Sequence, residues 1–315
     1  MKNTVLVITG PTASGKSGLG IQLAKRLNGV VISADSMQIY KGLNVGTAKV
    51  SAEEAEGIKH ELIDIVDIAT LFSVSDYKEL CYEKIEEILK SGKLPIIVGG
   101  TGLYINAIVN NMQFEKFDEK KEQQAEEKLQ EMVHNKSSEE LYDILYEMDK
   151  DAALKIGVGN DKRIIRAIKL NLLGVNKSSI DDKNDLWNKN PSKYNFLVVF
   201  LDMERDLLYD RIDKRVDSMI DEGVLDEVKL VYDLKEKSTT ASQAIGYKEF
   251  FPYIEGKATL EECAEILKQK TRNYAKRQIT WFRKLKDKVV INAMKSKEEI
   301  IEEIIRLYNE KNKWG

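Results

Sequence analysis

A glycine-rich loop near the start of the sequence is the strongest chemical signal in the chain. Residues 10–17 read GPTASGKS, a full match to the pattern GxxxxGK(S/T), between an apolar segment and an amphipathic one. Glycines let such a loop turn its backbone N–H groups toward phosphate oxygens, and the following helix adds partial positive charge at its N-terminus. The loop therefore predicts a site for a phosphate ester or a diphosphate, without telling whether the ligand is ATP.

Two side chains of this loop add to the backbone cradle. Lys16 supplies a positive point charge, and the hydroxyl of Ser17 is a ligand type that Mg²⁺ accepts. We therefore expect Mg²⁺ as the cofactor, at Ser17. The residues expected to hold the phosphates are Gly10, Pro11, Thr12, Ala13, Ser14, Gly15, Lys16 and Ser17.

One carboxylate, Asp35, follows the second predicted strand, VVISA. Because the carboxyl ends of parallel strands share one edge of a sheet, Asp35 should face the edge where the phosphate loop also lies. A helix cap, a ligand for a Mg²⁺-bound water and a general base are all compatible with this position. Gly42, Gly46 and Thr47 follow in a polar loop that is placed to line the same cleft.

A second polar segment follows the buried strand LPIIV at residues 94–98. It places two glycines and Thr101 where many phosphate-hydrolysing proteins with this loop carry the Asp that positions Mg²⁺. That Asp is absent here, and Asp202, after the strand FLVVFL, could take its place. Thr101 is compatible with an N-cap of the next helix or with a polar role in the cleft.

Three arginines, Arg205, Arg211 and Arg215, lie on one predicted helix near residues 204–222. Arg211 and Arg215 share a face of that helix because they are four residues apart. Arginines on one face suit a diphosphate leaving group or a phosphoryl transition state. A surface ion pair explains any single one of them equally well.

Charge is distributed unevenly along the chain, although the net charge is only −3. Residues 114–150 hold twelve Asp or Glu and six Lys, whereas residues 268–288 hold nine Lys or Arg and one Asp. In the basic segment the charges alternate with Tyr274, Trp281 and Phe282, a mixture that suits RNA phosphates and stacked bases. A solvated basic helix with its aromatic side chains in the core fits the same pattern.

Apolar segments and amphipathic segments alternate through residues 1–111, which predicts a mostly parallel sheet covered by helices. Residues 112–193 are highly charged, with apolar residues at helical spacing, and we expect an inserted all-helical subdomain there. The segment NFLVVFLD again has the apolar composition of a buried strand, so residues 194–315 should rejoin the first sheet. The expected fold class is α/β, a P-loop NTPase-like parallel sheet core with an inserted helical subdomain and a helical C-terminal region.

Composition excludes several other classes of protein. With 43% hydrophobic and 32% charged residues, 19 Gly and only 4 Pro, the chain is neither fibrous nor disordered. Its apolar runs are far shorter than the roughly 20 residues of a membrane helix, so we expect no membrane association. The first apolar run leads into the phosphate loop without a cleavage site, so we expect a cytoplasmic protein. Cys81, Cys263, His60 and His134 have no partners at ligand spacing, which argues against a protein-built zinc site.

Several segments together resemble the bacterial tRNA dimethylallyltransferases, also called isopentenyl-diphosphate:tRNA transferases. In order they are GPTASGKS, ISADSMQIYKGLNVGTAK, IIVGGTGLY, KRIIRAI, RIDKRVDSMIDEG, SQAIGYKEF and RNYAKRQITWFR. The resemblance runs through most of the chain, and no common kinase family shares the whole set. It implies transfer of a dimethylallyl group from dimethylallyl diphosphate to the exocyclic N6 amine of the adenosine 3′ of a tRNA anticodon. The phosphate loop would then hold diphosphate and not ATP.

The resemblance also implies roles for individual residues. Asp35 is the expected general base at the adenine amine, Thr101 touches the reacting region, and Arg215 binds diphosphate, so these three are the expected catalytic residues. The resemblance further implies tRNA contacts at Asp35, Ser36, Met37, Gln38, Lys162, Arg163, Ile164, Ile165, Arg166, Gly246, Tyr247 and Lys248. The basic segment adds Arg272, Lys276 and Arg277 as expected RNA contacts. We expect a monomer whose inserted subdomain grips the anticodon stem-loop.

Two other functions are compatible with parts of the sequence. A small-molecule kinase would hold ATP in the loop and use the arginines in a closing lid, although the chain has no short lid and carries a long basic helix. A nucleotide-gated RNA-binding switch would bind RNA without transfer chemistry. Labelled dimethylallyl diphosphate separates the three functions, because only a transferase labels the RNA.

Overall fold

The computed structural model describes residues 3–115, 117–176, 186–187, 189–234 and 240–313. The chain divides into two compact units, one made of residues 1–111 and 189–315 and the other of residues 112–188. The second unit ends before the expected residue 193 because Asn190 is tied to the first unit. Its backbone N–H donates to Asn110 O at 3.0 Å, and its side chain donates to Asn111 O at 3.1 Å.

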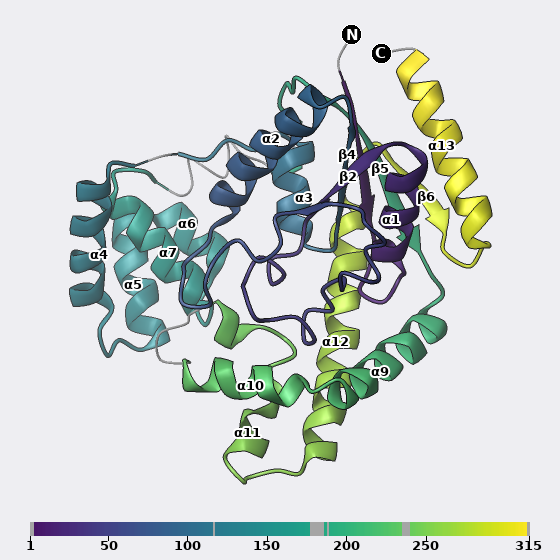
Figure 1. Ribbon diagram of the computed structural model, residues 1–315. Helices are drawn as coiled ribbons and strands as arrows, with labels where there is room; N and C mark the ends of the chain where they lie inside the picture. Colours follow the sequence, from purple (N-terminus) through teal and green to yellow (C-terminus); the bar gives the residue numbers. More distant parts are fainter. Residues whose placement is uncertain (1–2, 116, 177–185, 188, 235–239, 314–315) are drawn as a thin grey trace. The chain divides into compact units, whose positions relative to one another are not determined.

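A six-stranded sheet forms the centre of the first unit (Figure 1). Its strands are β1 (Thr4–Thr9), β2 (Gly29–Ser33), β3 (His60–Glu61), β4 (Leu94–Gly99), β5 (Asn195–Asp202) and β6 (Lys288–Asn292). The strand order is β3-β2-β4-β1-β5-β6, and every neighbouring pair is parallel. Leu6 of β1 lies opposite both Ile96 and Leu197, so the expected return of the chain to the first sheet at β5 is confirmed.

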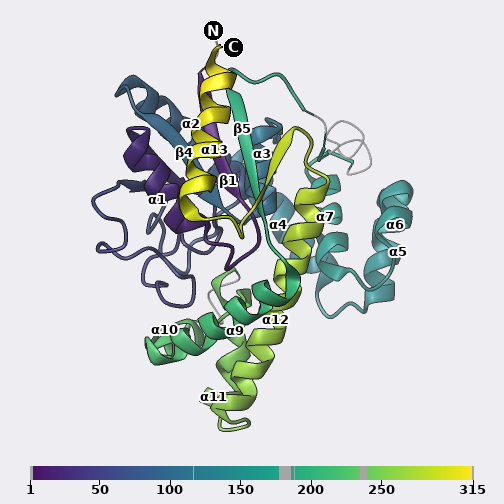
Figure 2. The same ribbon diagram turned by 90° about the vertical axis from the view of Figure 1, so that its right-hand side faces the viewer.

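Helices cover both faces of this sheet, which explains why β1 and β4 are buried along their whole length. Figure 1 shows α1 (Lys16–Arg26) and α13 (Lys297–Lys313) on one side and α2 (Val74–Lys90) and α3 (Gly102–Val109) on the other. In the turned view of Figure 2, α13 runs in front of the sheet. Apolar side chains of α1 and α13, such as Leu23 and Ile301, share one core with Leu6 and Ile8 of β1.

In its described residues, the part of the first unit between β5 and β6 is mostly helical. Its helices are α9 (Arg205–Asp221), α10 (Val224–Asp233), α11 (Phe251–Ile254) and α12 (Leu260–Arg283), with 3-10 turns at Ala241–Gln243 and Lys248–Phe250. Gly223, with φ of +89°, separates α9 from α10, because a left-handed backbone cannot continue a helix. A capping box between Thr259 and Glu262 starts α12.

The second unit is all-helical in its described residues. It contains α4 (Glu119–Val133), α5 (Ser138–Met148), α6 (Lys150–Ile156) and α7 (Asp161–Leu172). Ser137 and Glu140 form a reciprocal cap at the start of α5, with bonds of 3.2 and 2.8 Å. Leu129, Leu145 and Ile164 come from three different helices and pack in its core. Across the described residues of both units, no helix combines the length and the apolar character that a bilayer span requires.

Candidate functional site

Three loops meet at the carboxyl edge of the sheet, where β1, β2 and β4 end. Residues 10–15, 34–48 and 99–100 contribute to one cavity, together with side chains of α1, α9 and α12. The cavity is lined by Thr12, Lys16, Ser17, Asp35, Gln38, Thr47, Ala48, Val98, Gly99, Gly100, Arg215, Tyr274 and Gln278. The fold therefore brings the phosphate loop, Asp35 and Arg215 to one place, although they lie far apart in the sequence.

The phosphate loop has the backbone that its glycines predict. Gly15 has φ of +85° and stands at the N-cap of α1, so the first turn of that helix opens beside the cavity. At Gly10 a Cβ atom would lie 2.8 Å from Leu201 O, which only glycine avoids. Ser14 is buried under the loop, whereas Ser17 lines the cavity. Of the loop, Thr12, Lys16 and Ser17 line the cavity.

Lys16 is the cation at the floor of this cavity. Its Nζ donates to Pro11 O at 2.6 Å. Burial lowers the pKa of Lys16 to about 7, with a further contribution from the Arg215 guanidinium, while the carboxylate of Asp35 acts in the opposite direction. Because Lys16 and Arg215 line one cavity, an anion bound there would favour the charged form of Lys16.

Asp35 lies two residues beyond the end of β2, at the edge predicted from the sequence. Its Oδ1 accepts a hydrogen bond from Met37 N at 2.9 Å, so the carboxylate closes a local turn and caps no helix. Its charge raises the pKa of Tyr274, though less than burial does, and opposes the lowered pKa values of Lys16 and Arg215. Asp35 therefore lies in one cavity with Lys16, Arg215 and the phenol of Tyr274.

Thr101 holds the Asp35 turn in place. It occupies the N-cap position of α3, but its side chain makes no cap hydrogen bond. Instead its Oγ1 accepts from Ser36 N at 3.0 Å and lies 3.4 Å from Ser36 Oγ. The Thr101 amide donates to Ala34 O at 3.1 Å. The end of β4 therefore supports the end of β2 directly, and Thr101 has a tertiary role in place of the N-cap.

Arg215 is the one arginine of the three on α9 that reaches the cavity. Its Nη1 donates to Thr12 Oγ1 of the phosphate loop at 3.1 Å. Burial lowers the pKa of Arg215, and Asp35 partly offsets this. Arg205 and Arg211 are exposed and do not line the cavity. Among these arginines, Arg215 alone is positioned for an anion in the phosphate loop.

Helix α12 forms a wall of the cavity, which the sequence did not indicate. Gln278 Oε1 accepts from Thr12 N at 2.8 Å, and Gln278 Nε2 donates to Gly100 O at 2.9 Å. Cβ atoms at Gly100 and Gly102 would lie 2.4 Å from Gln278 and Trp281. The glycines that follow β4 are therefore needed for the close approach of α12. A pair of glycines after a buried strand was the available signal for this contact.

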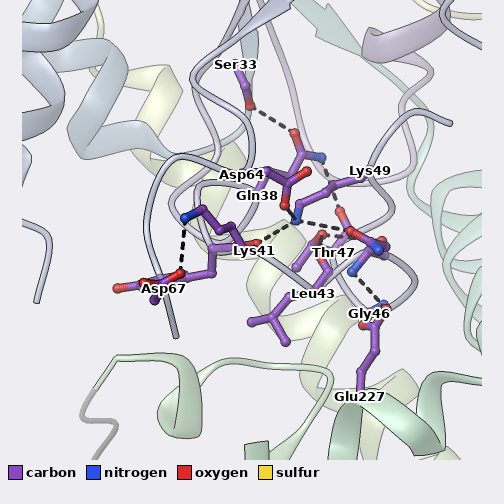
Figure 3. Close-up of polar contacts among 12 residues, drawn as sticks. Ser33, Gln38, Lys41, Leu43, Gly46, Thr47, Lys49, Asp64, Asp67 and Glu227 are labelled. Atoms are coloured by element: carbon purple, nitrogen blue, oxygen red, sulfur yellow. Dashed lines mark hydrogen bonds and ion pairs between the residues drawn. The ribbon is translucent and has the colours of Figure 1, made fainter. Parts of the chain in front are cut away.

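Gln38 lines the cavity, and its side chain is half-buried, as is that of Met37. Gln38 Oε1 accepts from Ser33 Oγ at 2.9 Å, and Nε2 donates to Thr47 O at 3.2 Å and Ala48 O at 3.3 Å (Figure 3). The Gln38 amide thus braces its own loop, and Met37 packs partly against an apolar cluster. Ser36 is half-buried, with its amide bound to Thr101.

Four of the other expected RNA contacts have buried or partly buried positions, which corrects the expectation for their side chains. Ile164 is fully buried in the core of the second unit, and Ile165 packs against that core. Tyr247 is also fully buried, and Gly246 packs against Gly46, whose carbonyl would lie 3.3 Å from a Cβ there. These positions lie in, or pack against, the interior of their units.

The charged residues of the same set are mostly on the surface. Those that are exposed or partly exposed are Lys162, Arg163, Arg166, Lys248, Lys276 and Arg277. Arg272 differs, because its Nη1 lies 2.6 and 2.7 Å from the two carboxylate oxygens of Asp213. It therefore ties α12 to α9. Lys276 and Arg277 lie over the rings of Tyr209 and Tyr274, at 5.7 and 5.5 Å from the ring centres.

The cavity offers Mg²⁺ few protein ligands. Ser17 and Asp35 contribute oxygen atoms to its lining, and Asp202 does not. In the part of the chain that the structure describes, no three His, Cys, Asp or Glu side chains group into a metal site. These residues fit a Mg²⁺ ion that takes most of its ligands from a diphosphate and from water, which is how Mg²⁺ commonly binds beside phosphates.

Comparisons with known proteins agree on one family. A family model described as IPP transferase matches residues 38–285. A tRNA dimethylallyltransferase of Acetivibrio thermocellus is 49% identical over 96% of this chain and 96% of its own length. One of Halalkalibacterium halodurans is 45% identical over 90% of this chain and 89% of its own length.

Solved structures give the same result. A crystal structure of a tRNA isopentenylpyrophosphate transferase from Staphylococcus epidermidis is 41% identical, covers 98% of this chain and 100% of its own, and has a TM-score of 0.71. A eukaryotic dimethylallyltransferase described as acting on tRNA is 32% identical, with a TM-score of 0.78. It covers 92% of this chain and 74% of its own.

Proposed function

The chain belongs to the IPP transferase family, and from this premise we propose how its cavity carries out the family's reaction. The activity is that of a tRNA dimethylallyltransferase, a prenyl transfer to tRNA. The nitrogen lone pair of an adenine amine attacks C1 of the dimethylallyl group, and the electrons of the breaking C–O bond leave with diphosphate. We propose that the acceptor is the N6 amine of the adenosine 3′ of the anticodon, and that the protein works as a cytoplasmic monomer.

The donor diphosphate is proposed to bind in the phosphate loop. Thr12, Lys16 and Ser17 of the loop line one cavity with Arg215, whose Nη1 donates to Thr12 Oγ1 at 3.1 Å. Negative charge grows on the diphosphate as the C–O bond breaks, so fixed positive groups stabilise the transition state more than the bound donor. When bound beside Ser17, Mg²⁺ would neutralise part of the same charge.

Asp35 is proposed as the general base. An adenine amine is a weak nucleophile, and it must lose a proton as the new C–N bond forms. Asp35 lies in the same cavity as Lys16 and Arg215, so a donor held by those cations would present its C1 near the carboxylate. Thr101 supports this role by holding the backbone of Ser36 at 3.0 Å. This shared cavity of base and cations is the single observation that carries the proposal.

The acceptor adenine must leave its stacked loop to enter a cavity at the sheet edge. Turning a base out of a stack costs roughly a few kcal/mol, which contacts to the surrounding RNA must offset. We propose that exposed basic side chains supply those contacts. Lys162, Arg163 and Arg166 lie on α7 away from its buried face, and Lys276 and Arg277 lie on α12.

The test of this function is transfer of a radiolabelled dimethylallyl group to unmodified tRNA. We expect label in the RNA without ATP, and none in a transcript whose adenosine 3′ of the anticodon is replaced by guanosine. Label in both transcripts would contradict the proposed acceptor position. Phosphorylation of a small molecule by ATP, with no label in RNA, would contradict the transferase and favour a kinase.

A further inference from the structure

The segment between β2 and β3, residues 34–59, supplies Asp35, Gln38 and Thr47 to the cavity. It folds as a series of turns without a helix or a strand of its own. A segment that lacks a regular ladder of backbone hydrogen bonds needs other partners for its polar groups. The contacts that fix this segment therefore decide how well its side chains are placed.

Glu227, on α10, binds the backbone of this segment. Its Oε1 accepts from Asn44 N at 2.8 Å and from Val45 N at 2.7 Å, and its Oε2 accepts from Gly46 N at 3.0 Å. Figure 3 shows the carboxylate of Glu227 pointing at Gly46. Three consecutive N–H groups that converge on one carboxylate form a charge-assisted anion site within the protein.

Tyr247 completes this contact from a second direction. Its hydroxyl donates to Glu227 Oε2 at 3.0 Å, and its side chain is fully buried. A Cβ atom at Gly46 would lie 2.6 Å from the Tyr247 hydroxyl, so the segment fits only because residue 46 is glycine. Burial, together with the Glu227 carboxylate, raises the pKa of Tyr247, which keeps the hydroxyl protonated as a donor.

The same segment is connected to the cavity through Gln38. Thr47 and Ala48 follow directly after the three bound amides, and their carbonyl groups accept from Gln38 Nε2. Gln38 is in turn bound to Ser33 at the end of β2. Hydrogen bonds and a short stretch of backbone therefore link Glu227 to Ser33, the last residue of β2, two residues before Asp35.

We propose that Glu227, held by Tyr247, is a positioning residue for the acceptor half of the site. Glu227 does not line the cavity, and its contacts are to residues 44–46 and Tyr247. It sets the segment that carries Asp35, Gln38 and Thr47 against the donor half, which is built from the phosphate loop and Arg215. This inference rests on the proposed transferase function. It states that Glu227 and Tyr247 act on the acceptor tRNA half of the site and not on the donor half.

The test compares Glu227→Ala, Glu227→Gln and Tyr247→Phe with a matched control. Tyr232→Phe also removes a hydrogen bond from a tyrosine to a glutamate, at 3.1 Å to Glu255, and Tyr232 lies on the same helix as Glu227. Three quantities are measured for each variant: the single-turnover transfer rate, the dissociation constant of dimethylallyl diphosphate, and amide hydrogen exchange at residues 44–46.

For Glu227→Ala we expect the single-turnover rate to fall about tenfold or more, because small displacements of reacting groups have large effects on rate. The donor dissociation constant should stay within about twofold, and exchange at residues 44–46 should become faster. Glu227→Gln keeps one acceptor oxygen, so its loss should be smaller than that of Glu227→Ala. Tyr247→Phe should also lose less, and Tyr232→Phe should match the wild type.

A wild-type rate in both Glu227 variants overturns the inference, as does an equal loss of donor affinity and of rate. If Glu227→Ala does not fold, Glu227→Gln and Tyr247→Phe decide by the same criteria, because both keep the shape of the side chain. A wild-type protein that binds the donor but labels no tRNA contradicts the proposed function instead. In that case amide exchange at residues 44–46 still tests whether Glu227 fixes this segment. Unchanged exchange in the variants would overturn the inference.

Discussion

Gln278 of α12 accepts a hydrogen bond from the backbone amide of Thr12, at 2.8 Å and across 266 residues of sequence. The other end of the same side chain donates to Gly100 O, after β4. Helix α12, which carries most of the basic segment, is thus attached to the phosphate loop itself. From the sequence this helix was expected to meet RNA, whereas it also shapes the cavity in which the donor is proposed to bind.

Replacing Gln278 tests the importance of this attachment. We expect Gln278→Ala to weaken binding of dimethylallyl diphosphate by roughly fivefold to tenfold, since about 1 kcal/mol is typical of the net contribution of one hydrogen bond. Calorimetric titration with the donor measures this. Thr280→Ala is the control, because Thr280 lies on the same helix and its hydroxyl donates to the carbonyl of Lys276, one turn earlier in that helix. Equal donor affinity in the two variants would contradict the role of Gln278.

Asp35→Asn separates the chemical step from binding. We expect the single-turnover transfer rate to fall by about 10²-fold or more, because the amide keeps the size of the carboxylate but cannot take a proton. Donor affinity should stay equal or rise slightly, since a negative charge near the diphosphate is removed. Rapid-quench measurement at saturating donor and tRNA gives the rate. A rate within a few-fold of wild type would mean that Asp35 is not the base.

Donor binding should depend on pH through Lys16. The pKa of Lys16 in the free protein is about 7, so the side chain is charged below this pH and neutral above it. A bound diphosphate favours the charged form, so binding above pH 7 must take up a proton, and affinity should fall by about tenfold per pH unit there. Calorimetry at pH 8 in buffers of different ionisation enthalpy should show uptake of about one proton.

Lys16→Met is the control for this pH dependence. It should bind the donor weakly at all pH values, without the fall in affinity above pH 7 that Lys16 causes. The same slope in the variant and the wild type would assign the titration to another group.

The basic surface of α12 should contribute to tRNA binding through Lys276 and Arg277. We expect their double replacement by Ala to weaken tRNA binding and to reduce its salt dependence, by roughly 0.9 in slope for each RNA phosphate that the variant no longer neutralises. Filter binding over a range of salt concentrations measures both quantities. Donor affinity should be unchanged, because neither side chain lines the cavity.

Arg272 should behave differently from these two residues, because it pairs with Asp213. Arg272→Ala should mainly lower stability, by about 1 kcal/mol for a partly exposed ion pair, as seen in denaturant unfolding. An unchanged stability together with a flatter salt dependence would place Arg272 among the RNA contacts after all.

The sequence alone determined the parts of this protein that depend on local pattern. The phosphate loop is recognised from the spacing of glycines, Lys and Ser within residues 10–17. The apolar runs of β1, β4 and β5 identify strands of a buried parallel sheet. The position of Asp35 followed from the same reasoning, because a residue just past a parallel strand must lie at the carboxyl edge. The capping box of Ser137 and Glu140 was equally local.

Only the tertiary structure decided which distant side chains complete the site. Arg205, Arg211 and Arg215 look alike on one helix, yet only Arg215 lines the cavity, because the way α9 packs fixes its direction. Gln278 and Glu227 look like ordinary polar residues of surface helices. Their partners are Thr12, 266 residues away, and Val45, 182 residues away. A hydrogen bond needs the donor and the acceptor within about 3 Å, and for such pairs that distance exists only once the chain has folded.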